Sequence, residues 1–188
     1  MSESGGRTVL VCGVSGVGKT HLIQSSLCQL PGALSWRASE MIGDARETAD
    51  PERLRTLSMD EIRYSQELLV EGFKIRRRAH PGDLVLLDAH SVIDSDHGLV
   101  EIPADIVAHL ELSGIIHVSD DIDRIVERRL MDRKRVRPTR TRDHLDTYQA
   151  RSLKVCQSYQ DALGIPLVQI RSGAIVSFIK AIDEIIRT

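Results

Sequence analysis

Aromatic residues are scarce in this sequence. They make up 3% of its 188 residues, with one tryptophan, three tyrosines and two phenylalanines. Proteins that bind single-stranded nucleic acid commonly stack the bases on aromatic side chains, so this scarcity argues against a nucleic-acid partner. The formal net charge of -2 identifies no other class of partner.

Cysteine is also rare. Cys12, Cys28 and Cys156 are far apart and have apolar neighbours. Their odd number and wide spacing argue against a disulfide framework and against a zinc site. We therefore interpret all three as small buried hydrophobic side chains in a reducing compartment.

Long hydrophobic runs are missing as well. No apolar run approaches the roughly 18 residues that a membrane span needs, and the N-terminal segment MSESGG is polar. We therefore expect a cytoplasmic protein without a membrane partner. A chain of 188 residues is long enough for one substantial core, so residues 1–188 are expected to form a single domain. The sequence leaves a homo-oligomer open.

The sequence does contain short apolar runs that alternate with longer amphipathic segments, the arrangement of βαβ units. Each run is bounded by turn residues and is predicted to be a buried parallel strand. The predicted strands cover residues 8–12, 84–87, 115–118 and 167–170, with a weaker fifth at 34–36.

Several helix ends are visible in the sequence. Ser58 and Glu61 form a candidate capping box, Ser119 precedes a first turn rich in aspartate, and Gly164 follows an amphipathic stripe. The last helix is expected to pack through an apolar face at Ile175, Phe178, Ile179, Ile182 and Ile186, which recur at helical spacing.

Residues 13–20 match the pattern GxxxxGK[ST], with a β-like run before them and a helical run over residues 21–30. The glycines let successive backbone N–H groups point inward around an anion, above the positive end of the following helix. The motif predicts an ATP site in an α/β P-loop fold of three α/β/α layers with a five-stranded parallel sheet. The predicted nucleotide-binding residues are Gly13, Val14, Ser15, Gly16, Val17, Gly18, Lys19, Thr20 and His21.

Four side chains near this loop have predicted roles. Lys19 would reach the β- and γ-phosphates, and the Thr20 hydroxyl would bind Mg²⁺. Asp88 ends the third predicted strand, and ligands of open parallel sheets bind at the carboxyl ends of the strands. We predict that Asp88 lies near Thr20 and holds Mg²⁺ directly or through water. His90 could point the same way. The alternatives are that Asp88 only caps the end of the strand and that His90 is a hydrogen-bonded loop histidine.

Residues 93–98, Ile-Asp-Ser-Asp-His-Gly, have turn composition and no recognised metal-ligand spacing. We predict a polar turn there.

Arginine is concentrated between residues 124 and 142, where the chain carries eight. Planar guanidinium groups on a closing loop can neutralise the charge that spreads over a phosphoryl group in transfer. A solvated basic face and a nucleic-acid patch are the alternatives. The arginines at or around the expected break between two helices are Arg128, Arg129, Arg133, Arg135, Arg137, Arg140 and Arg142.

The chain resembles the adenylate kinases of the archaeal type and, more distantly, the small adenylate-kinase-like ATPases linked to ribosome assembly. The resemblance rests on the GVSGVGKT loop, the Arg-Thr-Leu-Ser stretch at 55–58, the Leu-Asp-Ala-His strand end at 87–90 and the arginine-rich element at 137–142. It implies a helical acceptor-binding region at 37–80 and a short arginine-rich lid at 131–143.

The resemblance also implies roles for single residues. Asp88 and His90 would serve the metal and phosphate site, and the acceptor would lie against Arg55 and His90. Ser39 and Arg46 are further candidate acceptor contacts, and a helix cap or an exposed helix charge is the alternative for Ser39, Arg46 and Arg55. The lid arginines that would hold ATP and the moving phosphoryl group are Arg128, Arg137, Arg140 and Arg142. The family commonly has threonine where Ala89 stands, and residues 36–42 do not reproduce its monophosphate site, so the acceptor stays open.

Three functions are compatible with these features. The leading hypothesis is transfer of a phosphoryl group from Mg·ATP to a nucleoside monophosphate such as AMP, as in an adenylate kinase. The second keeps the ATP site but places a small hydroxyl-bearing metabolite in the acceptor pocket, which would require a carboxylate as general base. The third is a nucleotide-switched regulatory or ribosome-assembly ATPase, whose lid would be a partner surface.

Overall fold

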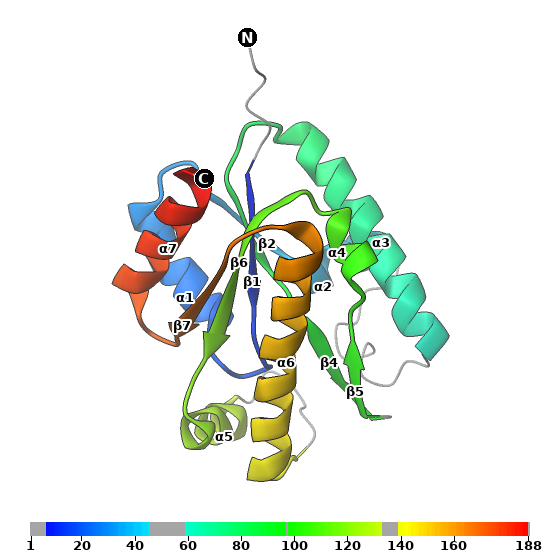
Figure 1. Cartoon of the computed structure of the whole chain (residues 1–188), viewed down its shortest axis with the longest axis vertical. Coiled ribbons are helices and arrows are strands. Elements are labelled where there is room, and N and C mark those ends of the chain that lie inside the picture. Colours follow the sequence, from blue (N-terminus) through cyan, green and yellow to red (C-terminus); the bar gives the residue numbers. More distant parts are fainter. Residues whose placement is uncertain (1–6, 46–58, 97, 133–138, 188) are drawn as a thin grey trace.

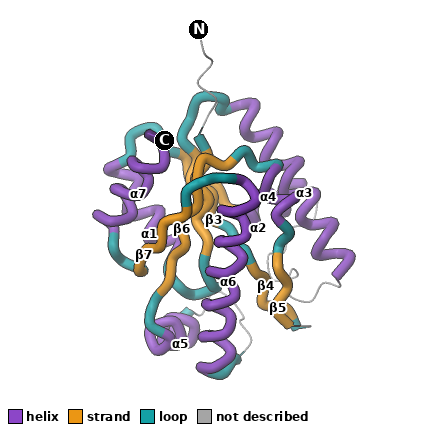
Figure 2. The backbone as a smooth tube through the Cα atoms, viewed as in Figure 1, coloured by secondary structure: helices purple, strands orange, loops and turns teal. Residues whose placement is uncertain are grey.

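The centre of the molecule is a sheet of five parallel strands in the order β2-β3-β1-β6-β7 (Figures 1 and 2). The computed structural model describes residues 7–45, 59–96, 98–132 and 139–187. All five predicted strands are confirmed, and the helical layers bury the apolar runs of β1, β3 and β6 most completely. The strands are β1 (Thr8–Cys12), β2 (Leu34–Arg37), β3 (Val85–Asp88), β6 (Leu112–Ser119) and β7 (Leu167–Arg171).

Helices cover both faces of this sheet. On β6, a β-carbon built on Gly114 would lie 2.6 Å from Cγ2 of Ile185 in α7, whereas His117 Nε2 lies 3.3 Å from the Ser152 hydroxyl of α6. These odd and even positions of one strand point to opposite faces, so α6 and α7 belong to different layers. Figure 1 shows α1 beside α7 and α6 in front of the strands. The helices are α1 (Lys19–Ser26), the short 3₁₀ helix η1 (Leu27–Gln29), α2 (Ala38–Ala45), α3 (Met59–Ala79), α4 (Ala104–Ala108), α5 (Ile122–Met131), α6 (Arg142–Leu163) and α7 (Ile175–Arg187).

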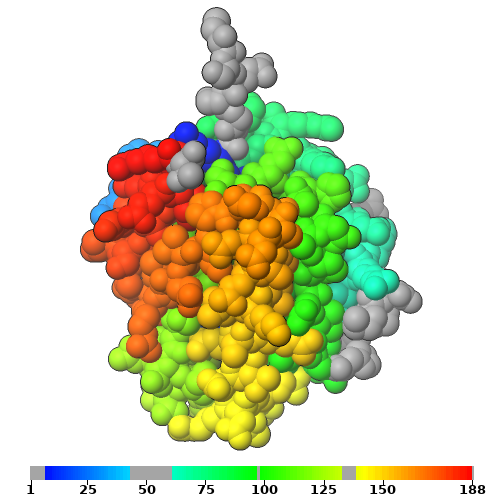
Figure 3. All heavy atoms as spheres, in the orientation of Figure 1, coloured from blue at the N-terminus to red at the C-terminus, as the bar shows by residue number. Residues whose placement is uncertain are grey.

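An antiparallel hairpin follows β3, where the sequence predicted only a polar turn. Its strands are β4 (Val92–Ser95) and β5 (Gly98–Glu101). Two buried hydroxyls of α6 fix its ends, because Tyr148 donates to the Val92 carbonyl at 3.0 Å and Tyr159 to the Ile102 carbonyl at 2.6 Å. In the space-filling view the hairpin lies along one side of α6 (Figure 3). The turn prediction was wrong because Asp94 and Ser95 have turn composition, whereas in the structure β4 pairs with Leu99 and Val100 of β5.

Some finer predictions also need correction. The cap of α5 is Asp121, whose carboxylate accepts from the Asp123 N–H at 3.0 Å, rather than Ser119. Gly164 does end α6, with φ of 65°. The predicted cap Ser58 lies outside the described residues. On α7 the buried side chains are Phe178, Ala181, Ile182 and Ile185, while Ile175, Ile179 and Ile186 are half-buried.

The cysteines divide into two kinds. Cys12 and Cys156 are buried thiols, as predicted, but Cys28 is exposed on η1. The prediction for Cys28 was wrong because its apolar neighbours Leu27 and Leu30 face the core while the short helix turns Cys28 outward. Within the described ranges, no helix combines the length and apolar character needed to cross a bilayer.

Candidate nucleotide-binding site

The loop between β1 and α1 has a backbone that only glycine adopts readily. Gly16 has φ of 88° and Gly18 has φ of 106°, in the left-handed region. The loop is also packed from outside. A β-carbon on Gly16 would lie 2.7 Å from Cγ of Arg129, and one on Gly18 would lie 2.6 Å from the Ser172 hydroxyl. Sequence and packing therefore fix the same loop conformation.

The Lys19 side chain lies within this loop. Its residue is 5% exposed, and its ammonium group donates to the carbonyls of Gly13 at 2.7 Å and Val14 at 3.3 Å. Helix α1 starts at Lys19, so the positive end of the helix lies beside that ammonium group. The loop therefore combines a positive helix end with a positive side chain.

His90 lies against the same loop. Its Nδ1 is 2.9 Å from the Gly13 carbonyl and 3.4 Å from the Lys19 ammonium nitrogen. The two contacts require opposite protonation of Nδ1, because the carbonyl only accepts and the ammonium group only donates. The shorter contact favours a protonated Nδ1 that donates to Gly13, which leaves Nε2 as the nitrogen able to accept a proton.

Thr20 and Asp88 meet at the rim of the loop. The Thr20 hydroxyl donates to Oδ2 of Asp88 at 2.5 Å, because β1 and β3 are neighbours and Val11 lies opposite Asp88 in the sheet. A hydroxyl and a carboxylate are the hard oxygen donors that Mg²⁺ prefers. Among the described residues no three His, Cys, Asp or Glu side chains form a metal cluster.

The charge of Lys19 also acts on the core behind the loop. His117 lies opposite Cys12 in the sheet and is 1% exposed. Burial, and second the positive charge of Lys19, lower the pKa of His117 to about 4. His117 is therefore neutral at pH 7.

Arg128 reaches the loop from α5. Its guanidinium group donates to the Val17 carbonyl at 2.8 Å and to the Asp120 carboxylate at 2.5 Å. Asp120 is a residue that the sequence analysis missed. It follows the carboxyl end of β6, beside β1, and that position at the ligand-binding edge was the signal available in the sequence.

The other predicted lid arginines are distributed over different contacts. Arg140 binds Asp94 of the hairpin, with Nε 3.1 Å from Oδ1, so Asp94 is a second missed residue. Arg142 forms an ion pair with Asp123 of α5, and both side chains are largely exposed. Arg137 lies outside the described residues.

The predicted acceptor residues are only partly described. Ser39 is half-buried on α2, whereas Arg46 and Arg55 lie outside the described residues. Arg37, which the sequence analysis did not select, ends β2 directly opposite Asp88 and binds Glu40 at 3.1 Å. His21 is exposed on the first turn of α1.

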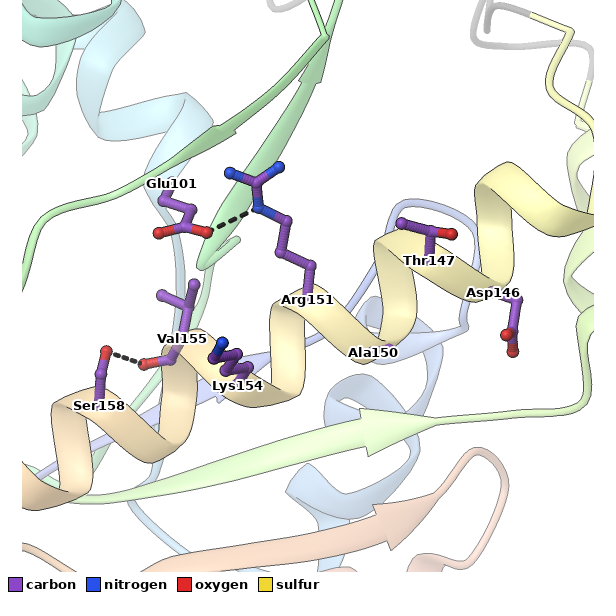
Figure 4. A pocket seen from close by; sticks show the side chains of 8 residues that line it. All are labelled: Glu101, Asp146, Thr147, Ala150, Arg151, Lys154, Val155 and Ser158. Carbon is purple, nitrogen blue, oxygen red and sulfur yellow. Dashed lines mark hydrogen bonds and ion pairs between the residues drawn. The ribbon is translucent and has the colours of Figure 1, made fainter.

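A separate hollow lies between β5 and the outer face of α6 (Figure 4). Arg151 points toward Glu101 there and donates to its carboxylate at 2.6 Å. The hollow is lined by Glu101, Asp146, Thr147, Ala150, Arg151, Lys154, Val155 and Ser158. None of them belongs to the phosphate loop, so this hollow is distinct from the nucleotide site.

Comparison with known families is consistent with the loop geometry. Residues 12–146 match a family described as an AAA domain. The chain belongs to that AAA-domain family. The match begins at the last residue of β1 and includes the phosphate loop, the hairpin and the arginine-rich segment. The protein therefore has the P-loop kinase fold, as predicted.

Solved structures share this fold across nearly the whole chain. Shikimate kinase from Bacteroides thetaiotaomicron is 13% identical, with a TM-score of 0.59 over 97% of this chain and 99% of that one. Shikimate kinase from Acinetobacter baumannii, solved with shikimate, is 12% identical, with a TM-score of 0.62 over 97% and 94%. A gluconokinase from Sinorhizobium meliloti is 14% identical, with a TM-score of 0.54 over 98% and 94%. At these identities the likeness concerns the fold alone.

Proposed function

We propose that the protein transfers the γ-phosphoryl group of Mg·ATP to a small acceptor molecule. The observation that carries this proposal is the Lys19 ammonium group inside a glycine loop whose rim holds the paired oxygens of Thr20 and Asp88. A triphosphate needs backbone N–H donors, a positive side chain and a metal around its β- and γ-phosphates. The loop offers the first two, and the rim offers ligands for the third.

Each side chain then has a separate task. Lys19 contacts the β- and γ-phosphates, while Thr20 and Asp88 would hold Mg²⁺, which neutralises charge on the same phosphates. Arg128 is already fixed against the loop by Asp120, so its position needs no rearrangement when charge develops. Transfer requires no covalent intermediate, because positioning and electrostatic stabilisation supply the rate enhancement.

The first candidate acceptor is a small hydroxyl-bearing metabolite. Solved structures of this fold include proteins described as shikimate kinase, sugar kinase and gluconokinase. A hydroxyl group must lose a proton when it attacks, so this reaction calls for a general base at the carboxyl edge of the sheet. Asp88 is the carboxylate best placed for that task, and it would have to combine it with holding the metal.

The second candidate is a nucleoside monophosphate, including AMP as in an adenylate kinase. One observation favours it. The carboxylates described at this edge already have cationic or hydroxyl partners: Asp88 with Thr20, Asp120 with Arg128, and Asp94 with Arg140. A phosphate oxygen attacks without a general base, and Arg37 beside Asp88 could bind an acceptor phosphate.

A two-panel assay separates the candidates. Purified protein with Mg·ATP is assayed for ADP release with AMP, CMP, UMP, GMP and deoxynucleoside monophosphates, and in parallel with shikimate, gluconate and simple sugars. The Lys19→Ala variant, purified identically, controls for contaminating kinases. Stimulation by one panel identifies the acceptor class. Slow hydrolysis that no acceptor stimulates would contradict the kinase proposal and favour a nucleotide-switched ATPase.

A further inference from the structure

The Asp94 carboxylate on β4 contacts basic side chains from two other parts of the fold. Its side chain is 6% exposed. Arg140 lies 3.0 Å from Oδ1 through Nη2, Arg129 of α5 lies 3.6 Å from Oδ2, and His144 Nε2 lies 3.3 Å from Oδ1. Arg140 also donates to the Ser95 carbonyl at 3.0 Å. One carboxylate thus joins the helices on both sides of the arginine-rich segment.

Asp94 is itself held in place. The Tyr148 and Tyr159 hydroxyls fasten the hairpin to α6 at two buried points. A side chain on a strand that is fixed in this way varies less in position than one on a loop. The position of Asp94 therefore fixes the positions of the guanidinium groups bound to it.

Arg129 connects this cluster to the phosphate loop. Its side chain is 8% exposed, and its Cγ lies 2.7 Å from the position that a β-carbon on Gly16 would occupy. Arg129 and Arg140 share the Asp94 carboxylate. Without the carboxylate, the two guanidinium groups would repel each other and separate.

We propose that Asp94 is a positioning residue for phosphoryl transfer, which holds Arg129 beside the phosphate loop, and Arg140 on the same carboxylate, without touching the nucleotide. The inference rests on the proposed kinase function and adds Arg129 and Asp94 to its machinery. Donors fixed in advance stabilise developing charge at no cost in reorganisation, whereas donors that must first find their place contribute less.

The test is Asp94→Asn, which keeps the side-chain shape and removes the charge. We expect kcat to fall about 10- to 100-fold, with the KM for ATP changing less than about threefold, because ground-state phosphate binding depends on the loop and Lys19. The matched control is Glu101→Gln on the same hairpin. This change removes the charge of an exposed carboxylate that pairs with Arg151 of α6. The control is expected to keep wild-type kcat.

Two further variants distinguish positioning from a structural role. Asp94→Glu keeps the charge and is expected to recover part of the lost kcat. Asp94→Asn combined with Arg129→Gln is expected to lower kcat by less than the product of the two single effects, because Asp94 and Arg129 act together and either change disrupts the same contact. If Asp94→Asn does not fold, Arg129→Gln and Arg140→Gln are assayed alone, and wild-type kcat in both would overturn the proposal.

Different results would overturn the proposed function and the role of Asp94. Wild-type protein that transfers phosphate to no acceptor overturns the function. Active wild-type protein with an equally active Asp94→Asn variant, or with fully multiplicative effects in the double variant, overturns the role of Asp94 alone.

Discussion

Thr20 and Asp88 are 68 residues apart in the chain, and their side-chain oxygens lie 2.5 Å apart. The contact exists because β1 and β3 are adjacent parallel strands whose carboxyl ends coincide. It joins the first turn of α1 to the end of a strand that follows α2 and α3 in the chain. A hydroxyl and a carboxylate from distant segments thus form one oxygen pair at the rim of the loop.

Asp88→Asn is expected to raise the Mg²⁺ concentration needed for half-maximal activity. The amide keeps the size of the carboxylate but loses its charge, and changes at metal-site groups typically cost about 10- to 100-fold in affinity. Activity is measured across a Mg²⁺ titration at saturating ATP. An unchanged Mg²⁺ dependence would show that Asp88 only bonds Thr20.

Lys19→Ala is expected to lower kcat by roughly 100-fold or more, since removing one preorganised charge-stabilising group commonly has an effect of this size. The fold should remain, because the Gly13 carbonyl can bind water once the ammonium group is gone. ADP release and circular dichroism check the two parts. Lys180→Ala, on the exposed face of α7, is the control and should behave as wild type. Retained turnover in Lys19→Ala would refute the role of Lys19.

Gly16→Ala is expected to weaken ATP binding about tenfold or more, because the new methyl group meets Arg129 and the backbone lies in the left-handed region. Gly32→Ala is the matched control. Gly32 has φ of 79°, but nothing lies within 4 Å of an added β-carbon. The control should lose about 1 kcal/mol of unfolding free energy and keep its ATP affinity. Isothermal titration and urea denaturation measure the two quantities, and equal ATP affinities in both variants would contradict the packing argument.

His117 predicts a loss of stability in acid. Its pKa of about 4 in the folded protein lies below the ordinary value of 6.5, so between these values the unfolded chain binds a proton that the folded chain does not. The stabilisation is complete above pH 6.5 and is lost as the pH falls toward 4, up to about 3 kcal/mol.

His117→Gln removes this titration. The stability advantage of the wild type over the variant, measured by urea denaturation, is expected to be smaller at pH 4.5 than at pH 7.5. His109→Gln, at the exposed end of α4, should keep the wild-type pH dependence. A wild-type advantage that stays constant between the two pH values would show that His117 is not the group responsible.

The sequence predicted features that are local or that repeat along the chain. Buried parallel strands such as β1 are continuous apolar runs, and residues 13–20 form one contiguous motif, so both are visible without tertiary information. Asp88 was selected by combining the strand pattern with the motif, because ligands of an open parallel sheet bind at the carboxyl ends of its strands and Asp88 ends such a strand.

Asp94 could not be found in this way. A polar stretch follows it in the sequence, and its burial depends on Arg129 and Arg140, which lie 35 and 46 residues further along the chain. Asp120 is similar, because its importance depends on Arg128 reaching back from α5 to the loop. Cys28 shows the opposite error, since a local apolar setting did not predict which way a short helix turns its side chain.

The two tyrosine anchors of α6 have a mechanical consequence. Tyr148 and Tyr159 are about three helical turns apart, so their two hydrogen bonds oppose rotation of α6 about its axis and sliding of α6 against the hairpin. Helix α5 is tied to the same hairpin through the buried contact of Arg129 with Asp94, whereas the largely exposed ion pair of Asp123 with Arg142 adds little. The hairpin is therefore a common frame for α5 and α6, and the guanidinium groups that rest on Val17 and Gly16 keep their place relative to α6.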